Sequence, residues 1–597
     1  MEQGPKAAGV RWEISDLYDG TIDARVAADL ETSLQKAEQF QARFYGNLAQ
    51  GDLSHDTLLA AIVQLEEIYT FAMRPEIYAF LAFSANTADD DFKALYAKCQ
   101  EVMARVQNLV LFFELEVQKI APEKFAQFFG EEEIDRYRHY LEGVRLFQPF
   151  SLSEKEEQVI NRKDLTGKNA FVSLFDEYTS SFAWQLEVDG AIQTLTGEEM
   201  RNLLRRPEPK LRERAKRAYD GRYGENAIIF CNVVNAIVKD HALEMEMRGY
   251  GSPITPSHLR NRIAPEIVET MMEVTAAHNH LAQAYFVLKA KLINIPKLRG
   301  CDLLAPISDR REHIPFAEGL RLVREAFASF SPEMAGLAQK MFDNKWIDAE
   351  VRRYKRGGAY CHGALPGHHP YILMSYNDDI DNVYTLAHEL GHALHDFYAG
   401  RKQTLFNYHP PLVAAETASV FAEMLLTRKL MQEVADRELR TAILTGVLED
   451  CFATIHTQNY YTLFELEAHR AGARQRLSAE QLCEIWTRQR TAMYGATVDF
   501  LPEQKWYWAA IPHFIHTRFY CYAYTFGALL VLSLFRRYEE EGDSFVPRYL
   551  RLLEAGGSQA PEDLTRQMGF DLRQPAFWEG GFAVIEQLLD DLREVAQ

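Results

Sequence analysis

The stretch from residue 385 to residue 395 constrains this chain most, because it contains the pattern H-E-x-x-H. On a helix, residues four apart leave the same face one turn apart, so His388 and His392 can both offer a nitrogen to one tetrahedral Zn²⁺. Glu389 is rotated by about 100° from His388. That is too far round to share the metal easily, but close enough to hold a water beside it.

Apolar residues recur at helical spacing through this stretch, which predicts a helix with its cap at Asp381 or Asn382. Gly391 lowers helix propensity, so we expect it to let another backbone approach closely. The alternative is that both histidines are ordinary core or boundary side chains of an amphipathic helix.

A hydrolytic zinc site needs a third protein ligand and one open position. Glu416 is the first acid in the apolar helical stretch that follows Pro410 and Pro411, where an unpaired carboxylate is costly. A metal removes that cost, and so does pairing with an arginine or a backbone donor. Glu423 lies seven residues on, on the same face, and is the second candidate ligand or an acceptor that holds one of the histidines.

Composition narrows the class of protein. The chain has 597 residues, is 47% hydrophobic and carries a formal net charge of −20, which disfavours nucleic acids and anionic membranes as partners. The seven cysteines are scattered and form no C-x-x-C, as is typical of a reducing cytoplasm. The start lacks an apolar segment of the kind found in signal peptides, and the apolar run 526–535 is too short to span a bilayer. We therefore expect a cytoplasmic protein.

Two regions are predicted. Residues 1–196 form an N-terminal helical region in which Pro75 kinks or breaks one long helix. It ends in a hairpin near 182–195, where alternating apolar residues flank Asp189-Gly190. Residues 197–597 form a helical catalytic domain that opens with a capping box at Thr196 and Glu199.

Two short strand-like pieces precede the motif, at 357–361 and 371–376. Small residues in the first piece, Gly358 and Ala359, leave an edge with which an extended peptide can pair as an added strand. The alternative is an ordinary small hairpin.

Together these residues carry a resemblance. Segments 385–392 and 415–419 resemble the thimet oligopeptidase and oligoendopeptidase F family of zinc metallopeptidases, with closer likeness to the oligoendopeptidase F branch. The likeness extends to segments 356–361, 370–373, 302–306 and 12–18. It implies a mainly α, two-lobed ovoid enzyme with a deep central channel and a small β-hairpin or sheet near the active site. It also implies one Zn²⁺ per chain, with Glu416 as third ligand and Glu389 as general base.

The family also places a histidine and several tyrosines over the zinc. The segment 513–524 resembles that region, so His513, Tyr522 and Tyr524 are candidate catalytic residues, with Tyr520 as a further candidate. The alternative is an aromatic stripe that packs in the core.

The resulting hypothesis is a zinc endopeptidase acting on short, unfolded peptides. Two alternatives stay open. A zinc carboxypeptidase or dipeptidyl carboxypeptidase needs a group that grips a terminal carboxylate, for which His368, His369 and Arg518 are candidates. A non-catalytic peptide-binding scaffold has no use for Glu389. The sequence does not predict the oligomeric state.

Overall fold

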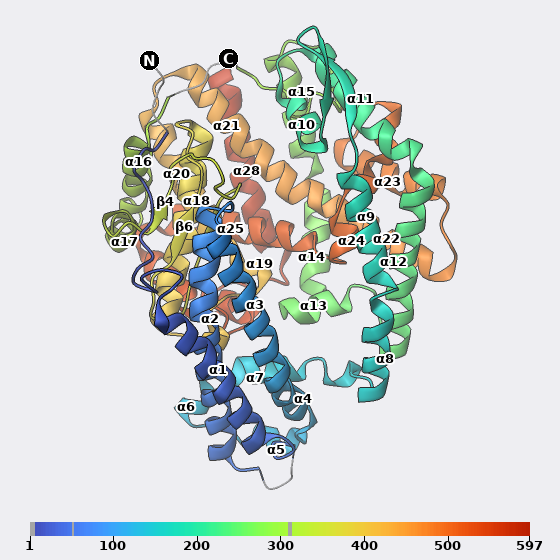
Figure 1. Cartoon of the computed structure of the whole chain (residues 1–597). Coiled ribbons are helices and arrows are strands. Elements are labelled where there is room, and N and C mark those ends of the chain that lie inside the picture. The colour runs from blue at the N-terminus through green and yellow to red at the C-terminus, as the bar shows by residue number, and fades with distance from the viewer. Residues whose placement is uncertain (1–5, 50–52, 309–312, 597) are drawn as a thin grey trace. The chain divides into compact units, whose positions relative to one another are not determined.

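The computed structural model describes residues 6–49, 53–308 and 313–596. Residues 1–5 lie outside the described residues. The prediction that no signal peptide is present rests partly on them. The described chain is mainly helical with three small sheets, which confirms the predicted fold class (Figure 1). The ovoid shape and the channel stay predictions.

The chain divides into two compact units, each built from three segments. Unit 1 comprises Met1–Pro149, Arg311–Glu433 and Arg537–Phe570, and unit 2 comprises Phe150–Arg310, Val434–Arg536 and Asp571–Gln597. The domain boundary expected after residue 196 stays a prediction. Residue 196 itself lies within unit 2.

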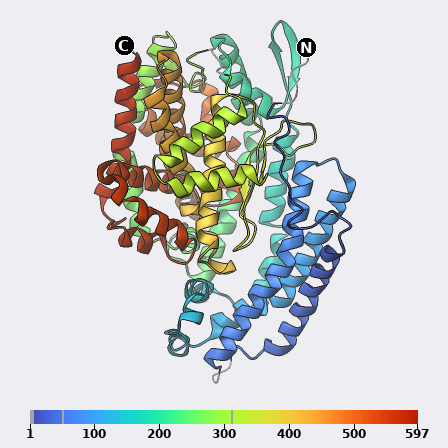
Figure 2. The ribbon, with the colours of Figure 1, turned by 90° about the vertical axis from the view of Figure 1, so that its left-hand side faces the viewer.

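Unit 1 begins with three long helices that pack side by side, α1 (Ala24–Phe44), α2 (His55–Ala85) and α3 (Asp90–Val110) (Figure 2). Pro75 lies buried inside α2 and does not end it. Shorter helices complete this region: α4 (Phe112–Lys119), α5 (Pro122–Ala126), α6 (Glu132–Asp135) and α7 (Arg138–Arg145).

The rest of unit 1 surrounds the motif helix α18 (Ile380–Gly400). Helices α16 (Phe316–Ala328), α17 (Pro332–Asp343), α20 (Thr417–Glu433) and α26 (Val546–Ala555) pack against it, and the short helix α19 (Leu412–Ala415) precedes α20 in the chain. A sheet of order β4-β6-β5 precedes α18 in the chain, made of β4 (Ile347–Asp348), β5 (Tyr360–His362) and β6 (Tyr371–Leu373). The two predicted strands are therefore present as the antiparallel pair β5–β6, but Gly358 and Ala359 come just before β5.

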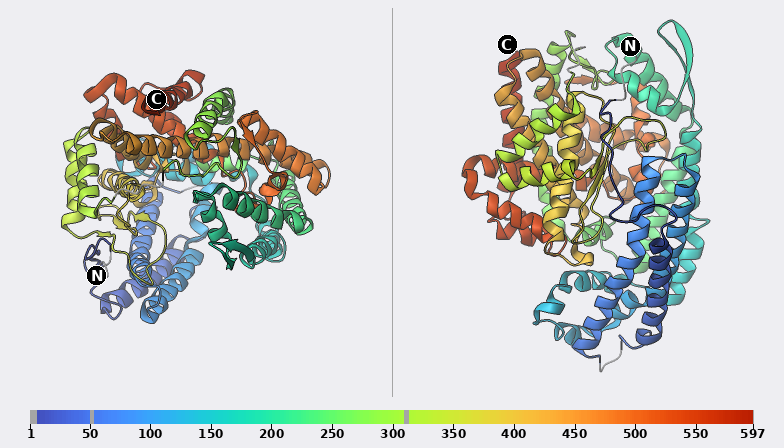
Figure 3. Two further views of the ribbon diagram at one scale, coloured as in Figure 1. Left: turned by 90° about the horizontal axis from the view of Figure 1, so that it is seen from above. Right: turned by 60° about the vertical axis from the view of Figure 1, so that its left-hand side comes forward.

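The N-terminal segment is bound beside this sheet (Figure 3). The Glu13 N–H donates to the Lys345 carbonyl, and the Val10 carbonyl accepts from the backbone of Ala349. Trp12 packs edge-on against Tyr371. The start of the chain thus supports the strands that lead into α18.

Helix α18 begins one residue before Asp381. Its N-cap is Asp379, whose side chain accepts from the Asn382 N–H, so the expected cap at Asp381 or Asn382 is wrong. The reason proposed for Gly391 is confirmed: a Cβ there would lie 2.6 Å from both the Ala418 carbonyl oxygen and the Ser419 Cα in the first turn of α20. Glycine allows α18 and α20 to meet backbone to backbone.

We expect Gly391→Ala to destabilise the protein by about 1–3 kcal/mol, because the added methyl overpacks the α18–α20 contact. Chemical denaturation of both proteins measures this change in the free energy of unfolding. Gly336→Ala is the control: Gly336 is an exposed helical position with open space around its Cβ site, so alanine should stabilise it by about 0.5–1 kcal/mol. Equal effects at the two positions would contradict the packing argument.

Unit 2 starts with helices α8 (Glu154–Asp164) and α9 (Lys168–Ser180) and the hairpin β1 (Trp184–Val188) and β2 (Ala191–Leu195). The hairpin is confirmed, and Asp189 and Gly190 both have positive φ, as a two-residue turn of type I′ requires. The capping box at Thr196 and Glu199 is also confirmed at the start of α10 (Gly197–Asn202).

The remaining elements of unit 2 are again helical except for the parallel pair β3 (Leu298–Arg299) and β7 (Val498–Asp499). The helices are α11 (Pro209–Glu225), α12 (Ala227–Arg248), α13 (Thr255–Asn261), α14 (Pro265–Ala277), α15 (Asn279–Leu292), α21 (Arg437–Cys451), the π-helix η4 (Phe452–Thr457), α22 (Gln458–Arg474), α23 (Ala479–Tyr494), the 3₁₀-helix η5 (Pro502–Ala510), α24 (His513–His516) and α28 (Pro575–Ala596). Helix α25 (Tyr522–Glu541) contains the apolar run and ends in unit 1, where α27 (Pro561–Gln567) also lies. In the part of the chain that is described, every helix is too short or too polar to cross a bilayer.

Candidate metal centre

Three side chains of unit 1 converge on one point. The Nε2 atoms of His388 and His392 lie 3.2 Å apart, and the Glu416 Oε2 lies 3.3 Å from the first and 3.4 Å from the second. Ligands bound about 2.0–2.1 Å from a tetrahedral ion are separated by about 3.3–3.4 Å. The three atoms therefore form a triangle of the size that Zn²⁺ requires.

Local structure explains how Glu416 reaches the histidines. The helix expected from residue 412 is interrupted: α19 ends at Ala415, and Glu416 stands at the junction before α20. The Ser419 hydroxyl donates to the Glu416 Oε2 over 2.6 Å. The sequence alone predicts no role for Ser419. Its spacing of three residues from Glu416 is the signal that could have found this contact.

Glu423 contacts the ring nitrogen of His388 that does not face the triangle. The His388 Nδ1–H donates to the Glu423 Oε1 over 2.6 Å, which orients the ring so that Nε2 faces His392 and Glu416. This is the second of the two roles proposed for Glu423. Such a partner orients a ligand histidine and increases its basicity.

The electrostatics of the cluster call for a cation. Burial opposes a charge on His388, but its contacts with Glu416 and Glu423 outweigh burial and raise the pKa of the imidazole to about 10. Burial likewise opposes a charge on Glu416, yet the two histidines hold the pKa of this carboxyl well below its usual value. In the metal-free cluster a proton thus occupies the place that suits a metal ion.

Glu389 lies beside this triangle. It is 6% exposed, burial raises its pKa, and its Oε2 is buried with no hydrogen-bond partner in the described chain. The backbone N–H of Cys361 in β5 opposes that rise. An orphaned buried acceptor next to three metal-type ligands fits a base that takes a proton from water. The donor set and this free oxygen together fit zinc.

Comparison with known proteins agrees with this geometry. A family model described as Peptidase family M3 matches residues 202–584, well over half of the chain. The chain belongs to peptidase family M3. A model described as Oligopeptidase F matches residues 116–183, so this M3 metallopeptidase lies in the oligopeptidase F branch.

Relatives of this M3 peptidase match almost end to end. Oligopeptidase PepF of Bacillus subtilis is 26% identical over 560 residues, covering 93% of this chain and 83% of its own. The oligoendopeptidase F homolog of Lactococcus lactis subsp. lactis is 25% identical over 594 residues, covering 98% and 97%. A crystal structure of a putative peptidase from Chlamydophila abortus has a TM-score of 0.90 at 23% identity, and oligoendopeptidase-F from Enterococcus faecium has 0.70 at 23%. These structures cover 98% and 95% of this chain, and 98% of their own chains in both cases, and show its fold.

The C-terminal candidates of this M3 peptidase lie in unit 2. The Nε2 of His513 and the Tyr524 hydroxyl are 3.3 Å apart, and the Tyr520 ring stacks on His513 with centroids 5.6 Å apart. Tyr522 is fully buried, and its hydroxyl accepts from the Asn261 amide over 2.7 Å. Burial favours Tyr520 and Tyr524 over Tyr522 as groups that meet a substrate.

Two of the candidates for gripping a terminal carboxylate are engaged elsewhere. The Nε2 atoms of His368 and His369 both face the Asp16 carboxylate, at 3.6 Å for His368 and closer for His369. The ring of His369 also stacks on Trp346. Arg518 belongs to unit 2.

We expect Glu423→Gln to weaken zinc binding by about 10–100-fold, because the amide can accept from His388 but adds no negative charge. Competition with a chromophoric chelator measures the affinity. Glu433→Gln removes the same charge from the exposed end of α20, where Glu433 pairs with Lys429, and should leave zinc affinity unchanged. An equal loss of zinc affinity in both variants would mean that only the net charge of the protein matters, and not the contact between Glu423 and His388.

Proposed function

We propose that this chain is a zinc-dependent endopeptidase that hydrolyses internal bonds of short, unfolded oligopeptides. The observation that carries the proposal is the triangle of His388, His392 and Glu416 with the unpaired Oε2 of Glu389 beside it. When bound, Zn²⁺ acidifies water and polarises the scissile carbonyl. Glu389 takes the proton of the attacking water and delivers it to the departing amine.

The edge strand β5 is the proposed place of the substrate backbone. Among the described strands β5 pairs only with β6, and the residues before it, Gly358 and Ala359, are exposed or half-buried. Gly358 has a φ of 84° and open space around it, so a neighbouring chain meets no side chain there. An extended peptide pairing along this edge presents its backbone, which suits cleavage with little sequence preference.

His513 and Tyr524 are proposed to stabilise the oxyanion that forms during hydrolysis. Tyr524→Phe should lower kcat by about 10²–10³-fold if its hydroxyl donates to that oxyanion. Tyr522→Phe is the matched comparison, because its hydroxyl is already engaged by Asn261 in the core. Steady-state kinetics on one peptide measures kcat for both variants. An unchanged kcat in Tyr524→Phe would refute the proposed contact between the Tyr524 hydroxyl and the oxyanion.

The function is tested with an internally quenched peptide of about ten residues, blocked at both ends, and with product masses read by mass spectrometry. Cleavage at an internal bond supports an endopeptidase, since both blocked ends exclude trimming from a terminus. Cleavage only after the C-terminal amide is replaced by a free carboxylate would indicate a carboxypeptidase. The third substrate is a folded protein whose amino-acid composition is similar to that of the peptide. Its rapid cleavage would contradict the restriction to unfolded peptides.

A further inference from the structure

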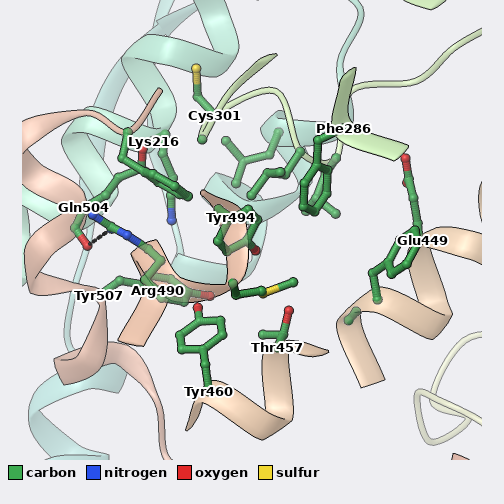
Figure 4. A pocket seen from close by; sticks show the side chains of 18 of the residues that line it. Lys216, Phe286, Cys301, Glu449, Thr457, Tyr460, Arg490, Tyr494, Gln504 and Tyr507 are labelled. Carbon is green, nitrogen blue, oxygen red and sulfur yellow. Dashed lines mark hydrogen bonds between the residues drawn. The ribbon is translucent and has the colours of Figure 1, made fainter. Parts of the chain in front are cut away.

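Unit 2 contains a pocket of about 270 Å³ that the peptidase chemistry does not use. It lies among α15, the π-helix η4, α22, α23 and η5, and Figure 4 shows the side chains that surround it. Its walls are largely aromatic, with contributions from Tyr285, Phe286, Tyr460, Trp486, Tyr494 and Tyr507. Leu304 and Ala453 line it and are exposed, so they mark its open side.

The charges in this wall do not balance. Lys216 donates to the Asp220 carboxylate over 3.0 Å, and Glu449 pairs with Lys289. Arg490 is 7% exposed and has no carboxylate partner in the described structure. Its Nη1–H donates to the Gln504 carbonyl over 2.9 Å, and its guanidinium lies 3.9 Å over the ring of Phe500. Asp220, whose charge acts on Arg490, already accepts from Lys216, so two buried cations share one carboxylate. Burying a charge without a partner of its own is costly.

Two hydrogen-bond donors in this part of the wall lack an acceptor among the described residues. The Arg490 Nε–H and the Trp486 Nε1–H are both buried without an acceptor in the described chain. The two residues are four apart on α23, so they occupy one face, a turn apart. The lining also includes Phe452 and Thr457 from η4, and π-helical segments are frequent at functional sites.

We propose that this pocket binds a small organic anion consisting of a carboxylate on an aromatic body. The carboxylate accepts from the guanidinium of Arg490 and from Trp486, and the ring lies between the aromatic walls. A cavity of roughly 150 Å³ accommodates benzene, so 270 Å³ has room for a ring and a short acid chain. A bare inorganic ion is disfavoured, because it would leave the space between the apolar walls empty.

The first test compares two ligands on the full chain by isothermal titration calorimetry. Hydrocinnamate should bind at least about tenfold more tightly than hydrocinnamamide, which has the same shape without the charge. The measurement is repeated on metal-free protein, where binding should persist, because a carboxylate could otherwise bind at the zinc centre. Equal affinities, no binding, or loss of binding with the metal would overturn the proposal. Chloride that displaces hydrocinnamate and binds as tightly would also overturn it.

The second test changes the protein. Arg490→Gln should weaken hydrocinnamate binding by about tenfold or more. Arg488→Gln is the control on the same helix, since Arg488 is exposed and pairs with Glu467. If Arg490→Gln does not fold, Trp486→Phe keeps an aromatic ring, removes the Nε1–H and should weaken the carboxylate more than the amide. Unchanged affinity in the folded variant, or equal loss in Arg488→Gln, would contradict the assigned site.

Discussion

Glu389→Gln is expected to lower kcat for a short peptide by about 10²–10⁴-fold while one Zn²⁺ per chain stays bound. The amide has nearly the shape of the carboxylate but cannot accept a proton from water. It also leaves the triangle of His388, His392 and Glu416 unchanged, because Glu389 lies beside these atoms and forms no ion pair with them in the described chain. The loss should fall on kcat more than on KM, since proton transfer belongs to the transition state.

Metal content is measured by atomic absorption and kcat by a steady-state assay. Together they show whether Glu389 acts as a general base or as a metal ligand. Asp381→Asn is the control, because it removes one acid from an exposed position in the first turn of the same helix and should change kcat less than about twofold. Activity that survives in Glu389→Gln would show that another group is the base. Loss of zinc along with activity would show that Glu389 is needed for metal binding.

The sequence predicted this centre well because helical spacing alone brings two histidines to one face. Gly391 was predictable for a similar reason: a poor helix former in an apolar stretch needs a packing explanation, and the backbone near Ala418 supplies it. Other details depend on choices that spacing does not resolve. Several polar residues precede α18, and each is able to cap it, so the use of Asp379 follows only from its extended backbone.

The C-terminal tyrosines show the same limit. Tyr520, Tyr522 and Tyr524 alternate, and which of them turns inward depends on where α25 starts. The helix begins at Tyr522, whose side chain is buried against Asn261, while Tyr520 and Tyr524 gather around His513. The break at Glu416 was also hidden, because no glycine or proline marks the end of α19. The pocket near Arg490 arises from segments distant in sequence and has no motif.

His392→Ala is expected to abolish both zinc binding and hydrolysis. The variant keeps only the His388 nitrogen and the Glu416 carboxylate, which is one ligand fewer than a hydrolytic zinc site needs. Loss of a partner outside the ligand set already lowers affinity about 10–100-fold, so loss of a ligand should lower it further. The purified variant should hold far less than one zinc per chain, and its kcat should fall at least as far as that of Glu389→Gln. The two variants differ in metal content, which identifies the role of each residue.

Proton release gives an independent measure of the same centre. The pKa of His388 is about 10 in the metal-free site, so at pH 7 its ring carries a second proton, which zinc must displace. Zinc binding should therefore release about one proton from the wild type, and apparent affinity should rise about tenfold per pH unit between roughly pH 7 and 9. Calorimetry in buffers of different ionisation enthalpy counts the protons. A pH-independent affinity would mean that the paired carboxylates of Glu416 and Glu423 do not hold that proton, and the ligand arrangement would then need revision.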